Sequence, residues 1–196
     1  MSLGTDVHPF ERLLGWAESL AERLPEVALL VQHGASRAPV GRAAGIRATD
    51  RDTLLGWYRG ADVVITQGGP GSILDAREAG KIPLVVPRDP ALGEHVDGHQ
   101  QAFVPVMAKA GEAVLVETFS DLVRLVDEGI ADPQRFRAPV RRADPAPAAA
   151  ALSRLVTAAL SAAPERGRLA RRLRLLLPSG HRPAAALTPP HTEGVS

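Results

Sequence analysis

Short apolar segments alternate with helix-forming segments along this chain, and the connections between them are short. The apolar segments are residues 27–31 (VALLV), 62–66 (DVVIT), 83–87 (PLVVP) and 113–116 (AVLV). Uniformly apolar segments of this length are typical of strands that are covered on both faces. The alternation therefore predicts an α/β fold, a Rossmann-like parallel sheet with helices on both faces.

Helical segments follow from the spacing of apolar residues and from their end signals. Between Phe10 and Leu24, apolar residues recur every three or four positions, with Pro9 suited to the first helical position and Pro25 ending the pattern. A short helix through Trp57 is expected to be capped by Asp50 or Asp52. Further helices are expected at residues 72–79, 99–111 and 120–129, the first of them closed by Gly80.

The composition changes near residue 141, which predicts the domain organisation. Residues 1–140 are expected to form one α/β domain, residues 141–163 a Pro/Ala linker and helix, residues 164–178 a basic amphipathic helix, and residues 179–196 a disordered tail. Six arginines and two acids lie from Pro164 onward, so the net charge of +1 averages a mildly acidic body and a basic tail.

Several classes of protein are excluded or disfavoured by composition. The chain has no cysteine, which excludes disulfides, thiolate metal sites and a thiol nucleophile. No apolar segment approaches the length of about 18 residues that spans a bilayer, so a cytoplasmic protein is expected. Nucleic-acid binding is not expected, because the net positive charge lies in the tail, far from Tyr58, the only tyrosine.

Parallel sheets bind ligands at the carboxyl ends of their strands, here the loops after Leu3, Val31, Thr66 and Pro87. The loop at residues 67–72 (QGGPGS) joins a strand to a helix, and its glycines let backbone amides approach a ligand such as a diphosphate. It matches neither the GxGxxG pattern nor the P-loop. An ordinary tight turn explains the loop equally well.

Acidic and histidine residues near these loops have two interpretations each. Asp75, one turn into the helix, either accepts hydrogen bonds from a ribose diol or stabilises the helix dipole. His8 lies near the end of the glycine-containing segment of residues 2–9, just before the first helix, and either reaches the ligand cleft or caps that helix.

The polar segment of residues 94–101 (EHVDGHQQ) contains the ingredients of a metal site. His95 and His99, with Glu94 or Asp97, have suitable ligand atoms. However, Asp97 followed by Gly98 argues against a helix that would align the two histidines, and no third ligand is evident. No metal is therefore expected, and a hydrogen-bonding loop for a polyhydroxyl ligand is favoured.

Three of these segments together resemble the C-terminal, donor-binding half of family 28 glycosyltransferases. They are GTDVHPF at residues 4–10, ADVVITQGGPGSILDAREAGKIPLVVP at residues 61–87 and GEHVDGHQ at residues 93–100. The likeness is greatest to small bacterial exopolysaccharide glycosyltransferase subunits akin to the catalytic subunit of the eukaryotic dolichol-linked N-acetylglucosaminyltransferase. The resemblance implies a single GT-B C-terminal lobe that binds a UDP-sugar and needs no cofactor or essential metal.

The resemblance also implies roles for individual residues. The diphosphate would be held by Gly4, Thr5, Gly68, Gly69, Gly71 and Ser72, with Gln67 in the same loop, and the ribose by Asp75. The sugar and diphosphate would be contacted by His99, Gln100 and Gln101. His8 is the expected catalytic base, with Asp6 or a partner protein as the alternative.

This sequence departs from the family's pattern in two places. Asp75 stands where many relatives have Glu, and only three residues precede Gly4, where relatives usually have a longer strand. The implied partner is a membrane-associated, acceptor-binding subunit, which would hold this chain at the inner face of the membrane and supply a polyprenyl-linked acceptor. The alternatives are a non-catalytic regulatory or scaffold protein that retains the lobe, and a nucleotide-sugar epimerase-like protein.

Overall fold

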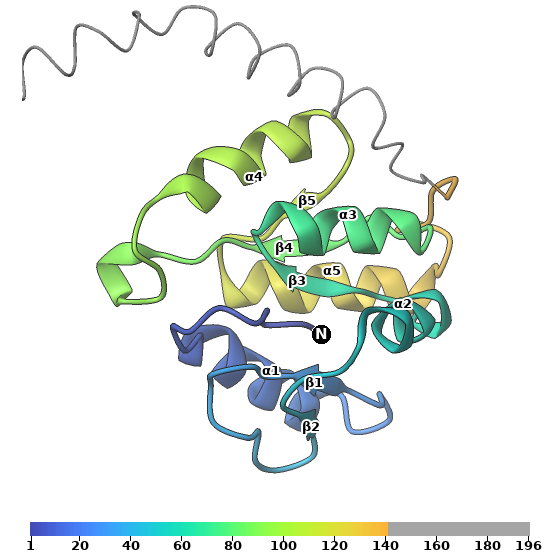
Figure 1. Cartoon of the computed structure of the whole chain (residues 1–196). Coiled ribbons are helices and arrows are strands. Elements are labelled where there is room, and N and C mark those ends of the chain that lie inside the picture. The colour runs from blue at the N-terminus through green and yellow to red at the C-terminus, as the bar shows by residue number, and fades with distance from the viewer. Residues whose placement is uncertain (141–196) are drawn as a thin grey trace, which may run out of the picture. The chain divides into compact units, whose positions relative to one another are not determined.

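A parallel β-sheet forms the centre of the structure, a computed structural model in which residues 1–140 are described (Figure 1). Its strands are β1 (Leu30–Gln32), β2 (Ala44–Ile46), β3 (Ile65–Gln67), β4 (Leu84–Val86) and β5 (Val114–Leu115). β1 pairs with β2, β3 with β4, and β4 with β5, all in parallel. This architecture confirms the α/β, Rossmann-like fold.

The first residues of the chain join the two halves of the sheet. Ser2 forms parallel bridges to both Gln32 and Thr66, and Leu3 donates a backbone hydrogen bond of 2.9 Å to the Gln32 carbonyl. Figure 1 shows the N-terminus between β1 and β3. Counting this segment as the first strand, the spatial order is 3-2-1-4-5-6, the Rossmann order. From the first segment, successive strands are added on one side as far as β2, and then on the other side from β3 onward. The strand order therefore reverses between the first segment and β3, and the ligand crevice is expected there.

Helices cover both faces of the sheet and make three layers (Figure 1). They are α1 (Glu11–Arg23), α2 (Arg51–Gly60), α3 (Pro70–Glu78), the short 3₁₀ helix η1 (Pro90–Leu92), α4 (His99–Lys109) and α5 (Phe119–Ala131). Side chains of α1 and α5 share one core cluster, and the rings of Trp16 and Phe119 lie 6.1 Å apart. Side chains of α2, α3 and α4 form the two clusters on the other face.

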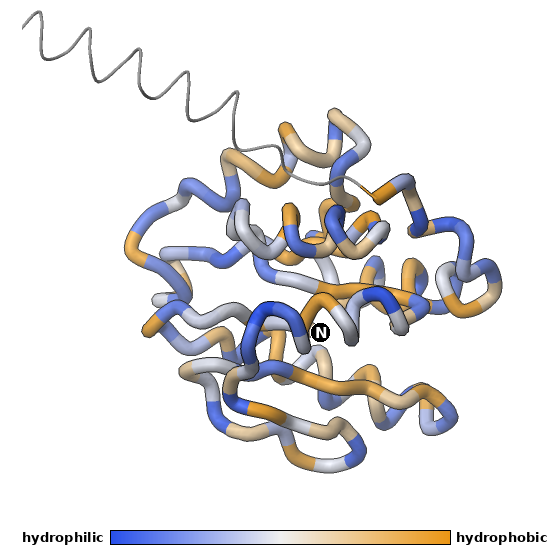
Figure 2. The backbone as a smooth tube through the Cα atoms, turned by 45° about the vertical axis from the view of Figure 1, so that its right-hand side comes forward, coloured by the Kyte–Doolittle hydropathy of each residue, from blue (hydrophilic) through white to orange (hydrophobic). Residues whose placement is uncertain are grey.

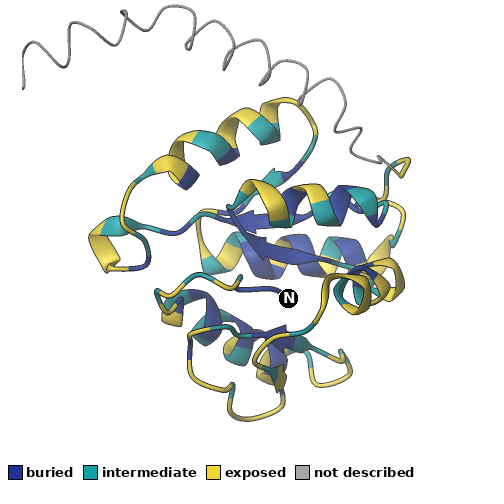
Figure 3. Cartoon of the chain, viewed as in Figure 1, coloured by how far each residue is buried: buried dark blue, intermediate teal, exposed yellow. Residues whose placement is uncertain are grey.

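Successive side chains of β4 point to opposite faces of the sheet, and both faces are buried, which explains why this strand is apolar throughout. Leu84 and Val86 belong to the α1–α5 core, whereas Val85 packs with Ile73 and Val104 of α3 and α4. All three β4 residues are fully buried, as the dark blue strands of Figure 3 show. Apolar colour follows the strands in Figure 2, and much of the hydrophilic colour lies on the loops. Because both faces are covered, the strand has no solvent-facing position for a polar residue.

Most helix limits agree with the sequence to within a few residues, and α2 resolves one choice. Its cap is Asp50, whose carboxylate accepts a hydrogen bond of 2.8 Å from the Thr53 backbone N–H. The expectation that Pro9 occupies the first helical position is wrong, because α1 begins at Glu11, with Phe10 at the N-cap. The Phe10 N–H donates to Ser36 Oγ at 2.7 Å and its ring is fully buried, which holds this residue at the cap.

Strand β2 was not expected from the sequence. Its residues, Ala44–Ile46, are mostly exposed and include a glycine, so neither hydrophobicity nor β-propensity identifies it. It exists because its backbone pairs with that of β1, with Val31 opposite Gly45. β2 forms one edge of the sheet, where one face of a strand can remain exposed.

The linker, basic helix and tail expected at residues 141–163, 164–178 and 179–196 lie outside the described residues. Within residues 1–140, no helix is both long and apolar enough to cross a membrane.

Candidate functional site

A cavity of about 380 Å³ lies at the carboxyl ends of β1, β3 and the first segment of the chain. It occupies the point where the strand order reverses, which is where open α/β sheets bind their ligands. Six of its lining residues were candidates from sequence. The lining consists of Ser2, Gly4, Thr5, Gln32, Thr49, Arg51, Leu54, Gln67, Gly71, Ser72 and Asp75.

Two glycines let the loops around this cavity approach each other. Gly4 has a φ of +86° and Gly34 a φ of +60°, a left-handed conformation that other residues rarely adopt. A Cβ atom on Gly34 would lie 2.2 Å from the carbonyl oxygen of Gly4. The glycine at position 34 therefore allows the loop after β1 to pack directly on the loop that forms the cavity wall.

The side chain of Gln67 holds the loop after β3 in shape. Its Oε1 accepts a hydrogen bond of 2.6 Å from the Gly69 N–H, and its Nε2 donates to Ser72 Oγ at 2.8 Å. The first turn of α3, with Gly71 and Ser72, therefore faces the cavity in a fixed orientation. The backbone N–H groups of a first helical turn favour an anion such as a phosphate.

Gln100 supports the same loop from behind. It is 3% exposed, and its Oε1 accepts hydrogen bonds from the Gly68 N–H at 2.9 Å and the Arg88 N–H at 3.1 Å. A Cβ atom on Gly68 would lie 2.7 Å from Val104 Cγ2, so α4 packs closely against the loop. Gln100 thus positions the glycine loop.

Asp75 faces the cavity with a charged partner. The Nε of Arg51, the first residue of α2, donates to Asp75 Oδ1 at 2.9 Å, and its Nη2 donates to Glu78 Oε2 at 2.6 Å. These bonds, the one to Glu78 first, raise the pKa of Arg51. The Arg51 side chain is 54% exposed, so solvent screens this ion pair and it contributes little to stability.

Arg88, at the end of β4, connects three loops at this edge of the sheet. Its Nη1 donates to the carbonyl oxygens of His8 at 2.8 Å and Glu94 at 2.7 Å, and its Nη2 donates to that of Leu3 at 2.7 Å. The guanidinium lies 4.8 Å from the centre of the Phe10 ring. Burial lowers the pKa of Arg88, opposed by the carboxylates of Asp6 and Glu94.

A second arginine fixes the loop that follows β4. Arg12 of α1 donates to both carboxylate oxygens of Glu94, from Nε at 3.0 Å and from Nη2 at 2.8 Å, and its Nη2 also donates to the Pro87 carbonyl at 2.9 Å. Glu94 is 4% exposed and accepts a further bond from the Asp89 N–H. Its oxygens are therefore occupied in holding the loop.

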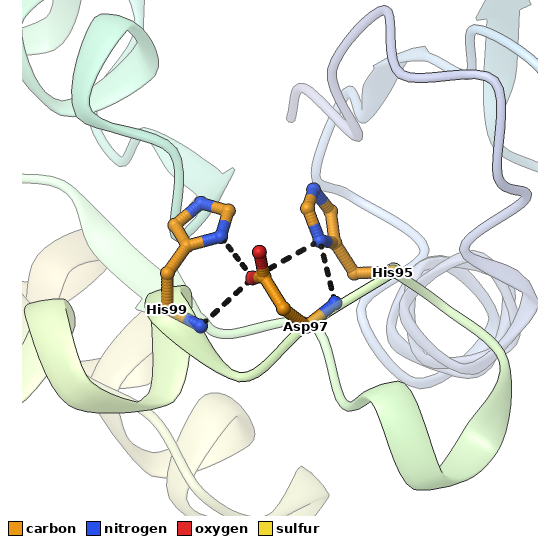
Figure 4. Close-up of side chains that lie close together, drawn as sticks. All are labelled: His95, Asp97 and His99. Atoms are coloured by element: carbon orange, nitrogen blue, oxygen red, sulfur yellow. Dashed lines mark hydrogen bonds and ion pairs between the residues drawn. The ribbon is translucent and has the colours of Figure 1, made fainter. Parts of the chain in front are cut away.

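Histidines and aspartates gather around the start of α4 (Figure 4). His99 Nδ1 contacts Asp97 Oδ1, and His95 Nδ1 lies 3.6 Å from the same oxygen. His8 Nδ1 lies 2.6 Å from Asp6 Oδ1, and the rings of His8 and His95 are 5.9 Å apart. Burial raises the pKa of Asp6, but hydrogen bonds from the His8 backbone and ring lower it below its usual value.

The predicted site residues thus fall into distinct groups. The lining of the main cavity contains Gly4, Thr5, Gln67, Gly71, Ser72 and Asp75. Gly68 and Gly69 belong to the glycine loop but are not part of that lining, and Gln100 supports the loop through its bond with the Gly68 N–H. His8 and His99 belong to the histidine–aspartate group, and Gln101 lines a different cavity of about 400 Å³ beside Arg12 and Trp16.

Sequence reasoning missed Thr49, Arg51 and Arg88. Thr49 and Arg51 follow β2, and because that strand was not expected, its carboxyl end was not considered as a place for ligand residues. Arg88 carried a signal: an arginine directly after a fully apolar strand must find hydrogen-bond acceptors at the sheet edge.

A parallel sheet in the Rossmann order, with a glycine loop, a helix N-terminus and an acidic residue at the reversal point, is typical of nucleotide-binding domains. The profile of the Glycosyltransferase family 28 C-terminal domain matches residues 45–167, and the chain belongs to this family. It is accordingly a sugar-donor-binding domain of the glycosyltransferase type. No curated protein and no solved structure matched the chain.

Proposed function

We propose that this chain is the donor-binding half of a glycosyltransferase that moves a hexose such as N-acetylglucosamine from a UDP-sugar to a polyprenyl-linked acceptor. The observation that carries the proposal is the cavity at the strand-order reversal, in a chain of the glycosyltransferase 28 family. Its size of about 380 Å³ lies within the range of small-ligand sites.

The lining suggests how the donor binds. The diphosphate lies against the Gly4–Thr5 loop and the first turn of α3, whose N–H groups favour an anion. The ribose diol donates hydrogen bonds to Asp75, replacing Arg51 as its partner. As UDP departs, its developing charge is stabilised by the same amides, so binding and leaving-group stabilisation use one set of groups.

The pair of His8 and Asp6 is the proposed catalytic base. With Asp6 Oδ1 accepting from His8 Nδ1–H, the His8 Nε2 is free to accept a proton. The acceptor hydroxyl oxygen bonds to the anomeric carbon as the bond to UDP breaks, which inverts the configuration, and the hydroxyl proton passes to His8 Nε2. This arrangement repeats the carboxylate–imidazole pairing by which enzymes hold a base in one tautomer.

We further propose that a membrane-associated partner subunit contributes the acceptor half of the enzyme, as the likeness to small exopolysaccharide glycosyltransferase subunits implies. Co-expression of the chain with such a subunit, followed by a UDP-release assay over a panel of UDP-sugars, tests the function. Release of UDP from one sugar donor, dependent on both proteins and on the acceptor, is expected. Failure of every donor to release UDP above the rate of either protein alone would contradict the proposal.

Replacing Asp75 by alanine is expected to weaken UDP binding at least tenfold. A hydrogen bond to a charged group contributes about 1.5–3 kcal/mol, and a factor of ten in affinity corresponds to about 1.4 kcal/mol. Calorimetric titration of UDP measures the change. The matched control is Glu78→Ala, because Glu78 shares the Arg51 ion pair but does not line the cavity. Equal weakening by both variants would assign the effect to Arg51.

Replacing Gln100 by alanine is expected to lower the unfolding free energy by about 2 kcal/mol and to weaken UDP binding. The substitution leaves two buried N–H groups, those of Gly68 and Arg88, without their acceptor. Urea denaturation measures the loss. Gln101→Ala, at the neighbouring exposed position, should leave the unfolding free energy unchanged; a similar loss in both variants would count against a positioning role for Gln100.

A further inference from the structure

We propose that the loop leading into α4 binds one divalent transition-metal ion of the zinc class through His95, Asp97 and His99. Each residue offers one ligand atom, and these atoms lie within 4.8 Å of one another (Figure 4). Tetrahedral zinc with bonds of about 2.0–2.2 Å places its ligand atoms roughly 3.3–3.6 Å apart, so the side chains must close by up to about 1.5 Å when the ion binds. The proposal does not depend on the transfer reaction.

The loop brings these residues together without a helix. The Asp97 N–H donates to His95 Nδ1 at 3.3 Å, and the His99 N–H donates to Asp97 Oδ1 at 3.0 Å. Because α4 begins at His99, with Gly98 as its N-cap, residues 95–97 precede the helix and are not helical. Alternate residues therefore converge. Of the two carboxylates that the sequence offered, Asp97 lies with the histidines, whereas the oxygens of Glu94 accept hydrogen bonds from Arg12 and Asp89.

A second carboxylate lies behind the ring of His95. Asp6 Oδ2 is 3.6 Å from His95 Nε2, the ring nitrogen that is not directed at Asp97. Metalloproteins commonly place a carboxylate in this position, where it orients a ligating imidazole and increases its basicity. The His95 side chain is only 12% exposed, so its orientation is restrained before an ion arrives.

The ligand chemistry selects the class of ion. Two imidazole nitrogens and one carboxylate oxygen suit Zn²⁺, Co²⁺ or Ni²⁺, whereas Mg²⁺ and Ca²⁺ prefer oxygen ligands alone. Three protein ligands leave at least one coordination position for water.

Cobalt(II) is the direct probe, because its visible absorption reports the ligands. The full chain, free of any affinity tag and of nucleotide, is titrated with Co²⁺, and Zn²⁺ affinity is measured by competition with a chromophoric chelator. We expect one ion per chain, displaced by Zn²⁺ and unaffected by millimolar Mg²⁺. No spectral change at millimolar Co²⁺ would overturn the proposal.

Variants locate the site, with circular dichroism to establish that each is folded. His95→Ala, His99→Ala and Asp97→Asn are each expected to weaken Zn²⁺ binding at least tenfold. His191→Ala, which removes a histidine distant in sequence, should leave the affinity unchanged. Unchanged affinity in His95→Ala and His99→Ala, or loss in His191→Ala alone, would overturn the assignment. UDP binding is measured separately, so a failed metal titration leaves the proposed function standing.

Discussion

Arg88→Met is expected to lower the unfolding free energy by about 3 kcal/mol and to reduce UDP affinity with it. Arg88 is 2% exposed, and its guanidinium donates to three carbonyl oxygens, those of Leu3, His8 and Glu94. Methionine fills similar space but donates nothing, and each buried polar group left without a partner costs about 1–3 kcal/mol. Relief of the buried charge offsets part of this loss. Urea denaturation measures the stability and calorimetry the affinity.

Two further variants make this prediction specific. Arg88→Lys keeps the charge but cannot reproduce the planar fork, so an intermediate loss is expected. Arg124→Met removes an exposed arginine from α5 that binds Glu128 at 2.8 Å, and should change the unfolding free energy by no more than about 0.5 kcal/mol. An Arg88→Met protein as stable as Arg124→Met would show that the three loops are held by other contacts.

Gly34→Ala is expected to destabilise the chain by about 2–4 kcal/mol and to disrupt the cavity. Two costs combine: alanine is disfavoured at a φ of +60°, by about 1–2 kcal/mol, and its Cβ would meet the Gly4 carbonyl oxygen at 2.2 Å. The Gly4 loop must move to relieve this contact, and it forms one wall of the cavity. UDP affinity should therefore fall together with thermal stability.

Gly15→Ala supplies the control for the same substitution. Gly15 lies within α1, and a Cβ there would meet nothing within 4 Å. Alanine is favoured over glycine inside a helix by about 0.5–1 kcal/mol, so this variant should be slightly more stable, with unchanged UDP affinity. If Gly34→Ala behaved like Gly15→Ala, the close packing of the two loops would be contradicted.

The sheet could be predicted from the sequence wherever burial forced a strand to be apolar. β4 is buried on both faces and its three residues lie inside the expected segment, residues 83–87. β2 could not be predicted, because an edge strand formed by backbone pairing leaves little trace in its side chains. Because β2 was not predicted, Arg51, which follows it, was not recognised as a site residue, and no local sequence pattern connects Arg51 with Asp75.

The candidate site was predicted in part, because local motifs and long-range contacts leave different traces. The loop at residues 67–72 is a local motif, and its Gln67, Gly71 and Ser72 line the cavity. By contrast, the contacts of Gln100 with Gly68, across 32 positions, and of Arg88 with Leu3, across 85, depend on the completed fold. The grouping of Asp97 with His95 and His99 could not be predicted either, because it depends on the shape of the turn before α4.

Calorimetric titration of the full chain with UDP tests the central claim most directly, that the cavity at the strand-order reversal binds the nucleotide of a sugar donor. Saturable binding at one site per chain is predicted, weakened at least tenfold by Asp75→Ala and retained by Glu78→Ala. The absence of binding at millimolar UDP, or undiminished binding in Asp75→Ala, would contradict the account.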